Sequence, residues 1–449
     1  MIAGFGVDGQ PRSWGKDGAA LRPGVKLLVD GLGATMFRLE VDRGNTAWEA
    51  ANDDADPFHL NWDAFDGDFS TDDFSDLYAY MRYLNDLGVT DIQLSLEGLL
   101  PDWMGRTAIG PGMEDEYVET VVAFLLYVRD RAPEPRPVFT RVNPWTEADL
   151  GKLESFLLGL DGQVQLARRL VDRMNQFPQL DDIELVLPEA SNEEWAADFR
   201  SAIKDDPAIV ARLAATSFHR YGGYRKTGDW VDASPPMWLT EFNSSGPFQQ
   251  DPFCYQVDWP DAMDAVGNLL GALQSGVTAG LFYSDVDAPH IHSDEKWESF
   301  GLLATTAEGD GDQCGRAGQP SDAELDSFEY VPKPSFYALA HVMRYVRPGA
   351  VPVPVDGGGD DVTVIAFRNP DGSVAVVAQD RGDARSVDVQ LDLDADGAGD
   401  RTWTPTVSTD GSYLVEGSSL AATGGAVTIT MPPRSVVTLL SPPPGPAGS

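Results

Sequence analysis

One carboxylate at the end of a short apolar run is the most informative feature of this chain. Glu241 closes the run Met237–Thr240, and polar or small residues occupy positions 243–246 directly after it. Buried parallel strands of barrels carry reactive side chains at their C-terminal ends. The run therefore predicts that Glu241 lies at the open end of a barrel, where a substrate can reach it. A strand-end glutamate that caps a helix or pairs with an arginine is the alternative interpretation.

Other short apolar runs also end in carboxylates, aromatic rings or hydrogen-bonding groups. They present Arg38 and Glu40, Glu97 and Trp103, Asn143, Trp145 and Glu147, Glu189, His219 and Tyr221, and Tyr283 with Asp285 and Asp287. Aromatic faces stack on the C–H surfaces of sugar rings, and paired carboxylates can supply an acid and a nucleophile. The set therefore predicts a carbohydrate site. Trp103, Trp145 and Trp238 are either core or cleft residues, and at least one is expected to line the cleft.

These side chains need a scaffold of alternating strands and helices, and the sequence predicts one. Strands are expected near Ile2–Val7, Thr35–Val41, Asp91–Leu96, Val138–Val142, Ile183–Leu187, Ala214–Phe218, Met237–Glu241 and Gly280–Tyr283. Amphipathic periodicity predicts helices at Asp72–Leu87, Asp115–Arg131, Gln163–Phe177, Pro260–Ser275 and Ser335–Val346. Eight such units in about 350 residues match an α/β fold of the (β/α)8 TIM barrel type, assigned to residues 1–350.

The pattern changes after Ala350. Short strands separated by turn residues are expected at Val362–Phe367, Val374–Gln379, Ser386–Leu393, Trp403–Val407, Ala426–Met431 and Ser435–Leu440. This predicts a C-terminal antiparallel β-sandwich over residues 351–441, packed on the barrel as a side domain. The proline-rich end, residues 442–449, is predicted to be a disordered tail.

The composition excludes some partners. The formal net charge is −39, so the chain should repel nucleic acid and anionic membranes. Only seven of the 32 basic residues are lysines, and an acidic, lysine-poor surface is typical of a halophilic source or of a GC-rich genome. No run is long enough to span a membrane. The protein is expected to be secreted with its leader trimmed away, or alternatively cytoplasmic.

Several motifs together resemble a known family. They are Gly4-Phe5-Gly6, Arg38, the run Leu99–Met104, His219-Arg220-Tyr221, Trp238–Glu241, Lys333-Pro334-Ser335, Arg347–Ala350 and Pro432–Val436. In this order they resemble clan A retaining glycoside hydrolases, most of all family 30, with relatives in families 39 and 5. The similarity covers most of residues 1–441.

The resemblance implies a β-glycosidase that acts by double displacement on a polysaccharide or oligosaccharide, without a cofactor. Glu241 would be the nucleophile, and Arg38 would hydrogen-bond it. The substrate-binding residues would be Arg38, Trp103, Asn143, Trp145, His219, Tyr221, Trp238 and Tyr283.

The chain departs from the family at strand 4, where the family has Asn-Glu-Pro and the glutamate is the acid/base. Here Asn143 is followed by Pro144, and the nearest carboxylate is Glu147. Glu147 is the preferred acid/base, and Glu189 or Glu97 could serve instead. If no residue replaces the missing glutamate, the alternative function is a catalytically inactive barrel that binds carbohydrate.

Two further features leave alternatives open. His290 and His292 follow Asp285 and Asp287, but the irregular spacing and a solvated loop favour no metal site there. Cys254 and Cys314 lie in the loops after strands 7 and 8, and could form one disulfide or remain free thiols.

Overall fold

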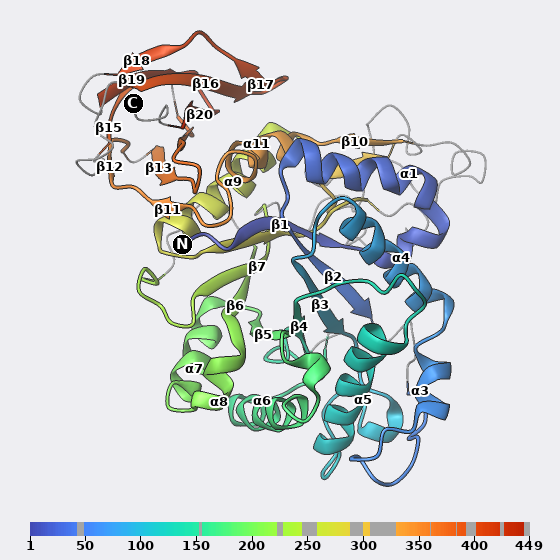
Figure 1. The fold of residues 1–449 in the computed structure, drawn as a ribbon. Coiled ribbons are helices and arrows are strands. Elements are labelled where there is room, and N and C mark those ends of the chain that lie inside the picture. Colours follow the sequence, from blue (N-terminus) through green and yellow to red (C-terminus); the bar gives the residue numbers. More distant parts are fainter. Residues whose placement is uncertain are drawn as a thin grey trace, which may run out of the picture.

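A computed structural model shows a closed barrel of eight parallel strands, followed by a β-sandwich (Figure 1). The structure describes residues 1–42, 49–151, 155–221, 228–244, 258–287, 300–305, 329–359, 361–382, 384–391, 401–422 and 426–443. The barrel strands are β1 Gly4–Gly9, β2 Met36–Asp42, β3 Ile92–Glu97, β4 Arg141–Asn143, β5 Glu184–Ala190, β6 Leu213–Tyr221, β7 Met237–Asn243 and β8 Ala279–Phe282. They pair in sequence order, and β8 closes on β1, which confirms the predicted barrel.

Helices cover the outside of the barrel. They are α1 Trp14–Leu27, α3 Trp62–Asp68, α4 Asp72–Asp86, α5 Glu114–Leu126, α6 Leu160–Met174, α7 Glu193–Ile203, α8 Pro207–Arg212, α9 Trp259–Gln274 and α11 Pro334–Met343. The predicted helices are present with ends shifted by up to five residues. The predicted strand over Val138–Val142 is reduced to the three residues of β4.

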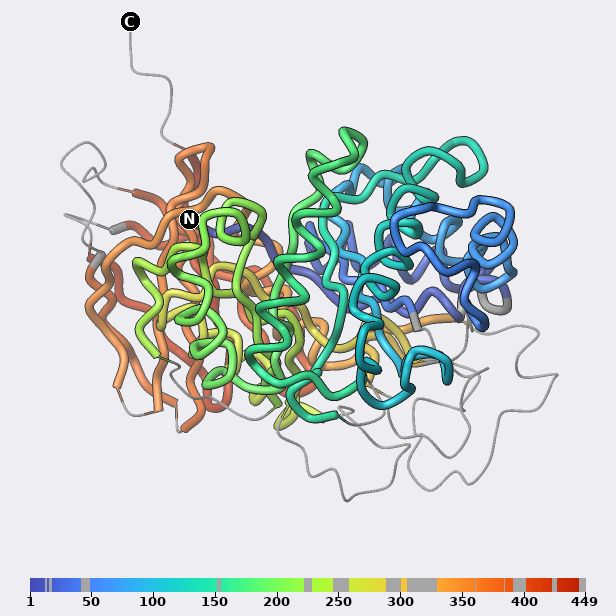
Figure 2. Tube along the Cα trace, turned by 90° about the horizontal axis from the view of Figure 1, so that it is seen from below, coloured from blue at the N-terminus to red at the C-terminus, as the bar shows by residue number. Residues whose placement is uncertain are grey.

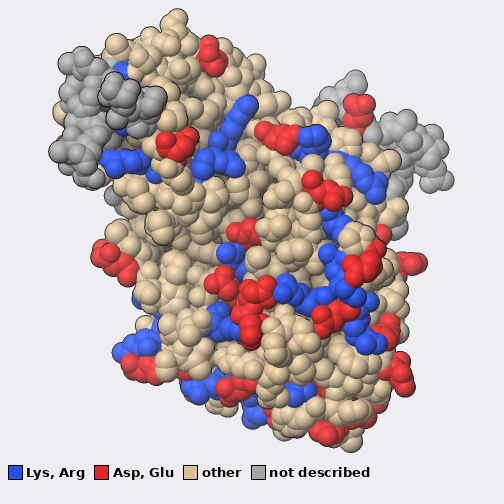
Figure 3. Space-filling view, in the orientation of Figure 1, with Lys and Arg blue, Asp and Glu red and all other residues tan. Residues whose placement is uncertain are grey.

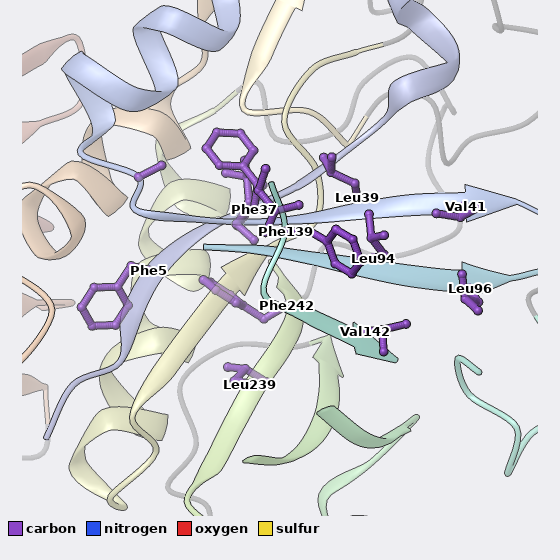
Figure 4. Packing of buried hydrophobic residues seen from close by; sticks show 14 of the residues in the cluster. Phe5, Phe37, Leu39, Val41, Leu94, Leu96, Phe139, Val142, Leu239 and Phe242 are labelled. Carbon is purple, nitrogen blue, oxygen red and sulfur yellow. The ribbon is translucent and has the colours of Figure 1, made fainter. Parts of the chain in front are cut away.

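Alternation along the strands separates an apolar outer face from a mostly polar inner one. Figure 4 shows Phe37, Leu39 and Val41 of β2 beside Leu94 and Leu96 of β3, all buried against the surrounding elements. The intervening side chains, such as Arg38 and Gln93, therefore face the barrel interior. The lower interior is closed by a separate apolar cluster of Met36, Val186, Ala215, Trp238, Ala279 and Leu281.

The first strand requires glycine at one position. A Cβ on Gly6 would lie 1.7 Å from the carbonyl oxygen of Met36 on the neighbouring strand. No other residue fits this close approach of two backbones. The opening Gly4-Phe5-Gly6 motif thus has a packing reason.

The chain after the barrel forms two antiparallel sheets. One contains β11 Val351–Pro352, β13 Val362–Arg368, β14 Val374–Asp380, β20 Ser435–Ser441, β16 Arg401–Thr409 and β17 Ser412–Glu416, with β18 Leu420–Ala422 paired to β16. The other contains β12 Val355–Asp356, β15 Arg385–Leu391 and β19 Ala426–Met431. Their facing side chains share one apolar core, so the predicted sandwich is confirmed. Residues 444–449 of the predicted tail lie outside the described residues.

The sandwich lies beside the barrel (Figures 1 and 2), and hydrogen bonds join it to helices α9 and α11. Trp259 of α9 donates from its indole nitrogen to the carbonyl of Arg434 at 2.6 Å. His341 of α11 is fully buried between the hydroxyls of Thr438 and Ser408, each 2.8 Å from a ring nitrogen. The side domain therefore covers one flank of the barrel.

An antiparallel pair of short strands, β9 Leu303–Thr305 and β10 Tyr330–Pro332, was not expected from the sequence. Among the described residues, no helix is both long and apolar enough to cross a membrane.

Candidate active site

Three side chains from different elements meet at the C-terminal end of the barrel. An oxygen of Glu147, an oxygen of Glu241 and a ring nitrogen of His219 all lie within 4.8 Å of one another. Nδ1 of His219 is 2.8 Å from Glu147 Oε1, and it also contacts Oε2 of Glu241. The structure therefore brings together the two carboxylates that the sequence ranked first.

Glu241 points into the barrel because β7 contains one irregular residue. Phe218 of β6 pairs with Leu239, and His219 pairs with Glu241, so Thr240 is skipped in the register. The shift allows Leu239 and Phe242 both to pack in the outer apolar core, while Glu241 turns inward. Tyr221, two residues after His219, donates a hydrogen bond to Glu241.

Glu147 reaches the same point through an unusual backbone. Its φ is +45°, and Glu189 opposite it has a φ of +52°, values that side chains other than glycine rarely adopt. The two residues are tied together, because the backbone nitrogen of Glu147 donates to the carbonyl of Glu189 at 2.8 Å. Strained backbones of this kind concentrate at functional sites.

Asn143 stabilises the turn that carries Glu147. Its amide nitrogen donates to Ser95 at 2.8 Å, to Thr146 at 3.1 Å and to the carbonyl of Trp145 at 3.3 Å, and its oxygen accepts from Gln93 at 2.7 Å. Asn143 is fully buried. Its polar atoms are therefore already used to position the turn, and the expected contact of Asn143 with substrate stays a prediction.

Arg38 lies fully buried beneath the site and holds several carboxylates. It donates to Glu189 at 3.1 Å, to Glu97 at 2.9 Å and to Thr146 at 3.3 Å, and lies 3.4 Å from Asp8. Within the described part of the chain it makes no hydrogen bond to Glu241. The expected direct bond is therefore wrong, and Arg38 acts on Glu241 through its charge. With no exposed atoms, Arg38 also does not face a substrate.

The pKa of Glu241, the nucleophile candidate, is lowered, whereas burial by itself raises the pKa of an acid. Burial alone raises the pKa of Glu241, but the charge and hydrogen bond of His219, the charge of Arg38 and the hydroxyl of Tyr221 together hold that pKa well below its usual range. Glu241 is therefore ionised at neutral pH, as a nucleophile must be.

Glu189 is a poor acid/base candidate. Burial raises its pKa, yet the charge of Arg38 and hydrogen bonds from His219 and Ser217 outweigh that effect and lower it. Its side chain has no exposed surface, whereas those of Glu147 and Glu241 are 15% and 10% exposed. A substrate can therefore reach Glu147 and Glu241 but not Glu189.

Two of the three tryptophans, left open as core or cleft residues, lie in the core. Trp145 is fully buried in the main apolar core, and Trp238 belongs to the cluster that closes the bottom of the barrel. Large flat side chains fill core volume as readily as they stack on sugars, and the sequence does not separate the two uses. Trp103 and Tyr283 remain partly exposed, so they stay candidates for the cleft.

Two buried acids flank the site, of which Asp8 was not expected from the sequence and Asp285 was expected only as one of several groups at a strand end. Asp8 of β1 is fully buried next to Arg38, and burial raises its pKa well above the usual value. Asp285 accepts a 2.6 Å hydrogen bond from Tyr80, and burial raises its pKa to about 7. Only their positions next to strand ends 1 and 8 could have indicated them.

The loop that begins after β8 does not start as a solvated segment. Asp285 and Asp287 are fully buried, and Asp287 pairs with Lys333 at 2.8 Å. His290, His292, Cys254 and Cys314 lie outside the described residues.

The described residues contain one group with metal-ligand spacing, which is Glu147, His219 and Glu241. Both ring nitrogens of His219 face carboxylate oxygens, because Nε2 is 3.1 Å from Glu189 on the other side. A ring that donates from both nitrogens offers no lone pair to a metal. The arrangement fits a hydrogen-bonded cluster better than a metal site.

A cavity of about 550 Å³ adjoins the cluster. Its lining includes His219 and Tyr221, together with Glu193, Glu194, Arg220 and Trp230. The cavity is large enough for a sugar ring and offers an indole and several hydrogen-bonding groups.

The chain is similar in sequence to one known family model and in fold to several solved structures. Residues 349–439 match the model of the glycosyl hydrolase family 30 beta sandwich domain. The fold is similar to the catalytic domain of GH30 xylanase C from Talaromyces cellulolyticus, with 18% identity, 98% of this chain and 97% of that chain covered, and a TM-score of 0.71. It is also similar to a GH30 endoxylanase from Clostridium papyrosolvens C71, with 15% identity, coverage of 98% and 96%, and a TM-score of 0.68.

A third similar structure is the endo-beta1,6-glucanase BT3312, with 14% identity, 98% of this chain and 92% of that chain covered, and a TM-score of 0.62. The C-terminal sandwich thus matches a domain of family 30, and the barrel with its side domain has the fold of family 30 structures, which confirms the resemblance of this chain to clan A glycoside hydrolases of that family.

Proposed function

We propose that this protein is a retaining β-glycoside hydrolase that acts on a polysaccharide or oligosaccharide by double displacement. The observation that carries the proposal is the approach of Glu147 and Glu241 to within 4.8 Å at the barrel mouth. Retaining glycosidases hold their two carboxyl groups about 5–5.5 Å apart, whereas inverting enzymes leave room for a water molecule between them.

In this proposal Glu241 attacks the anomeric carbon while the bond to the leaving oxygen breaks. Glu147 donates its proton to that oxygen and later removes a proton from the attacking water. Arg38 and Tyr221 support the ionised state of Glu241 by charge and by a hydrogen bond. The displaced position of Glu147 replaces the glutamate that is missing after Asn143.

The substrate class follows from the site and from the similar structures. Two of these are described as xylanases and one as an endo-beta1,6-glucanase, so xylan and β-1,6-glucan are the first substrates to test. An extracellular location would suit such polymers. No phosphate or nucleotide site is needed for this chemistry.

The test is a covalent trap combined with product analysis. The protein is incubated with 2-deoxy-2-fluoro-β-xylosyl and β-glucosyl fluorides, and the modified peptide is identified by mass spectrometry. We expect one fluoroglycosyl group on Glu241 and none on a Glu241→Gln variant. Proton NMR of fresh products should show the β-anomer first.

Two outcomes would contradict the proposal. Initial release of the α-anomer would indicate inversion. Absence of activity on β-glycans and aryl β-glycosides in both low and molar salt, together with saturable oligosaccharide binding, would indicate a binding protein instead. Both assays use the full chain.

A further inference from the structure

His219 occupies an unusual position between three carboxylates. Nε2 is 3.1 Å from Glu189 Oε2, and Nδ1 is 2.8 Å from Glu147 Oε1 and in contact with Glu241 Oε2. Ionised carboxylates only accept hydrogen bonds, so a ring that faces them from both nitrogens needs a hydrogen on each. The geometry is that of an imidazolium and not of a neutral imidazole.

Glu189 contacts Nε2 of His219, on the side of the ring that faces away from the cleft. It has no exposed atoms, accepts from Arg38 Nε at 3.1 Å, and its own backbone nitrogen donates to Ser217 at 2.9 Å. Arg38 is fixed in turn by Asp8 and Glu97. Glu189 is therefore a negative charge that neither solvent nor substrate displaces.

The charged and titratable groups around His219 come from six parts of the barrel. They are Asp8 of β1, Arg38 of β2, Glu147 after β4, Glu189 of β5, Tyr221 of β6 and Glu241 of β7. Burial opposes the charged ring, but the neighbouring carboxylates outweigh it and raise the pKa of His219 well above its usual value.

We propose that His219, kept as an imidazolium by the positioning residue Glu189, is a hydrogen-bond donor shared by the two reacting carboxyls, and that its Nδ1 hydrogen follows the negative charge between Glu241 and Glu147. The inference rests on the proposed function and adds to it the group that compensates charge during both steps. The displaced acid/base makes it possible, because Glu147 lies against the same nitrogen as the nucleophile.

Protons and charges balance at each step. In the free enzyme Glu241 is ionised, Glu147 is protonated and Nδ1 donates to Glu241. When Glu241 bonds to the anomeric carbon, the leaving oxygen takes the proton of Glu147, and the negative charge now lies on Glu147. Nδ1 then donates to Glu147 with little movement, since both oxygens are already beside it.

The second step reverses the exchange. Glu147 takes a proton from water, the water oxygen bonds to the anomeric carbon, and Glu241 leaves as a carboxylate that again accepts from Nδ1. His219 keeps both of its protons throughout, and the cycle consumes one water molecule. A fixed positive charge of this kind stabilises the charge that develops in each step without reorganisation of solvent.

The direct test is the protonation state of His219, read by ¹⁵N NMR of histidine-labelled protein. The chain has five histidines, so a His219→Asn variant assigns the signal. We expect His219 to stay doubly protonated well above the pH at which free histidine, with a pKa of about 6.5, loses its proton. In Glu189→Gln its pKa should fall by at least about 1 unit, since an opposite charge within hydrogen-bond distance shifts pKa by roughly 1–3 units.

Kinetics provide the second readout. In Glu189→Gln the alkaline limb of kcat/KM should move to lower pH together with the NMR pKa, so that activity at pH 8 falls at least about tenfold more than activity at pH 5. Glu184→Gln is the matched control, because Glu184 is on the same strand but half-exposed at its other end, paired with Arg141. It should leave both the signal and the pH profile unchanged.

The transfer of the Nδ1 hydrogen bond from Glu241 to Glu147 is tested on the trapped 2-fluoroglycosyl enzyme. With Glu241 blocked by a 2-fluoroglycosyl group, His219 should remain doubly protonated in the wild type. In Glu147→Gln, trapped with the same fluoride donor, the pKa of His219 should fall by at least about 1 unit, because no ionised acceptor remains at Nδ1.

The possible results distinguish failure of the His219 inference from failure of the proposed glycosidase function. A wild-type enzyme that hydrolyses glycosides while His219 titrates near its ordinary value overturns this inference and leaves the proposed function intact. A folded Glu189→Gln with unchanged His219 pKa and unchanged pH profile also overturns it. If Glu189→Gln does not fold, the wild-type and trapped-state spectra decide. Lack of activity on every substrate overturns the proposed function, and the partner exchange with it.

Discussion

Glu147 lies in the turn after β4 and Glu241 lies on β7, and each places a carboxylate oxygen beside the same nitrogen, Nδ1 of His219. This arrangement distinguishes the chain from the family pattern that its motifs resemble, in which the acid/base directly follows the strand-4 asparagine. Here the candidate acid, Glu147, lies four residues after Asn143, in a turn fixed by hydrogen bonds from that asparagine and by a left-handed backbone at Glu147 itself.

The role of Glu147 predicts a dependence on the leaving group. In Glu147→Ala, kcat/KM for unactivated β-glycosides should fall by about 10²–10⁴, because general acid assistance contributes about that much. Hydrolysis of dinitrophenyl glycosides should fall far less in the first step, since their leaving group needs no proton. Added azide should accelerate the variant and give a β-glycosyl azide.

The control for this prediction is the other acid of the same turn. Asp149 accepts from the backbone nitrogen of Ser191 at 3.1 Å and takes no part in the cluster. Asp149→Asn keeps an acceptor there and should stay within a few fold of wild type. Equal losses on both classes of leaving group in Glu147→Ala would mean that Glu147 is not the acid.

Arg38 is expected to contribute strongly to stability. Arg38→Met would leave Asp8 fully buried without the guanidinium beside it and Glu189 with only His219 as a basic neighbour among the described residues, and removal of one member of a buried ion pair typically costs about 3–5 kcal/mol. The urea midpoint at pH 7 should fall accordingly. Arg106→Met provides the comparison, because its pair with Asp102 is solvent-exposed and should contribute less than about 1 kcal/mol. Similar midpoints for the two variants would show that the buried network carries no net stability.

His341 at the interface between barrel and sandwich predicts an acid-dependent loss of stability. Burial lowers its pKa to about 3, whereas in the unfolded chain it should be near 6.5. Above pH 6.5 both states are neutral. Below it only the unfolded state gains a proton, so stability is lost as pH falls from about 6.5 towards about 3, by an amount on the order of a few kcal/mol.

The measurement is the free energy of unfolding against pH for wild type and His341→Gln. The variant should be less stable at pH 7, because it loses one of the two hydroxyl contacts, but its stability should fall less steeply between pH 6.5 and pH 4. His59→Gln is the control, since His59 is exposed and pairs with Asp54. A parallel slope in wild type and His341→Gln would contradict the prediction.

The net charge of −39 predicts stabilisation by salt. Figure 3 shows acidic side chains spread over one face, with Lys and Arg beside many of them. Raising KCl from about 0.1 M to about 1 M shortens the screening length from about 10 Å to about 3 Å, which weakens the repulsion among the excess carboxylates. The Tm from calorimetry should therefore rise with KCl, whereas an equal osmolality of sorbitol should have a different and weaker effect. A flat or falling Tm would count against a halophilic adaptation.

Length and residue pattern were enough to predict the barrel and the sandwich, and they pointed to Glu241 and Glu147, with Glu189 and Glu97 as alternatives, as the carboxylates to expect at the barrel mouth. They could do so because apolar periodicity sets which segments become strands and helices, and because the ends of parallel strands converge on one face. Glu241 and His219 were candidates by that rule and by the resemblance to family 30, and Glu147 was the nearest acid to the strand that lacks the glutamate of the family.

The directions of the individual side chains, and the contacts that hold them, depend on the folded barrel and could not be predicted from the residue pattern. The skipped residue Thr240, which turns Glu241 inward, and the left-handed backbone of Glu147 depend on contacts between strands that no local pattern encodes. Trp145 and Trp238 lie in the core, because burial of a side chain depends on the space that residues distant in sequence leave unfilled. Arg38 is bonded to Glu189, and not to Glu241, because side-chain partners are chosen by packing across the barrel, where residues far apart in sequence come within hydrogen-bonding distance.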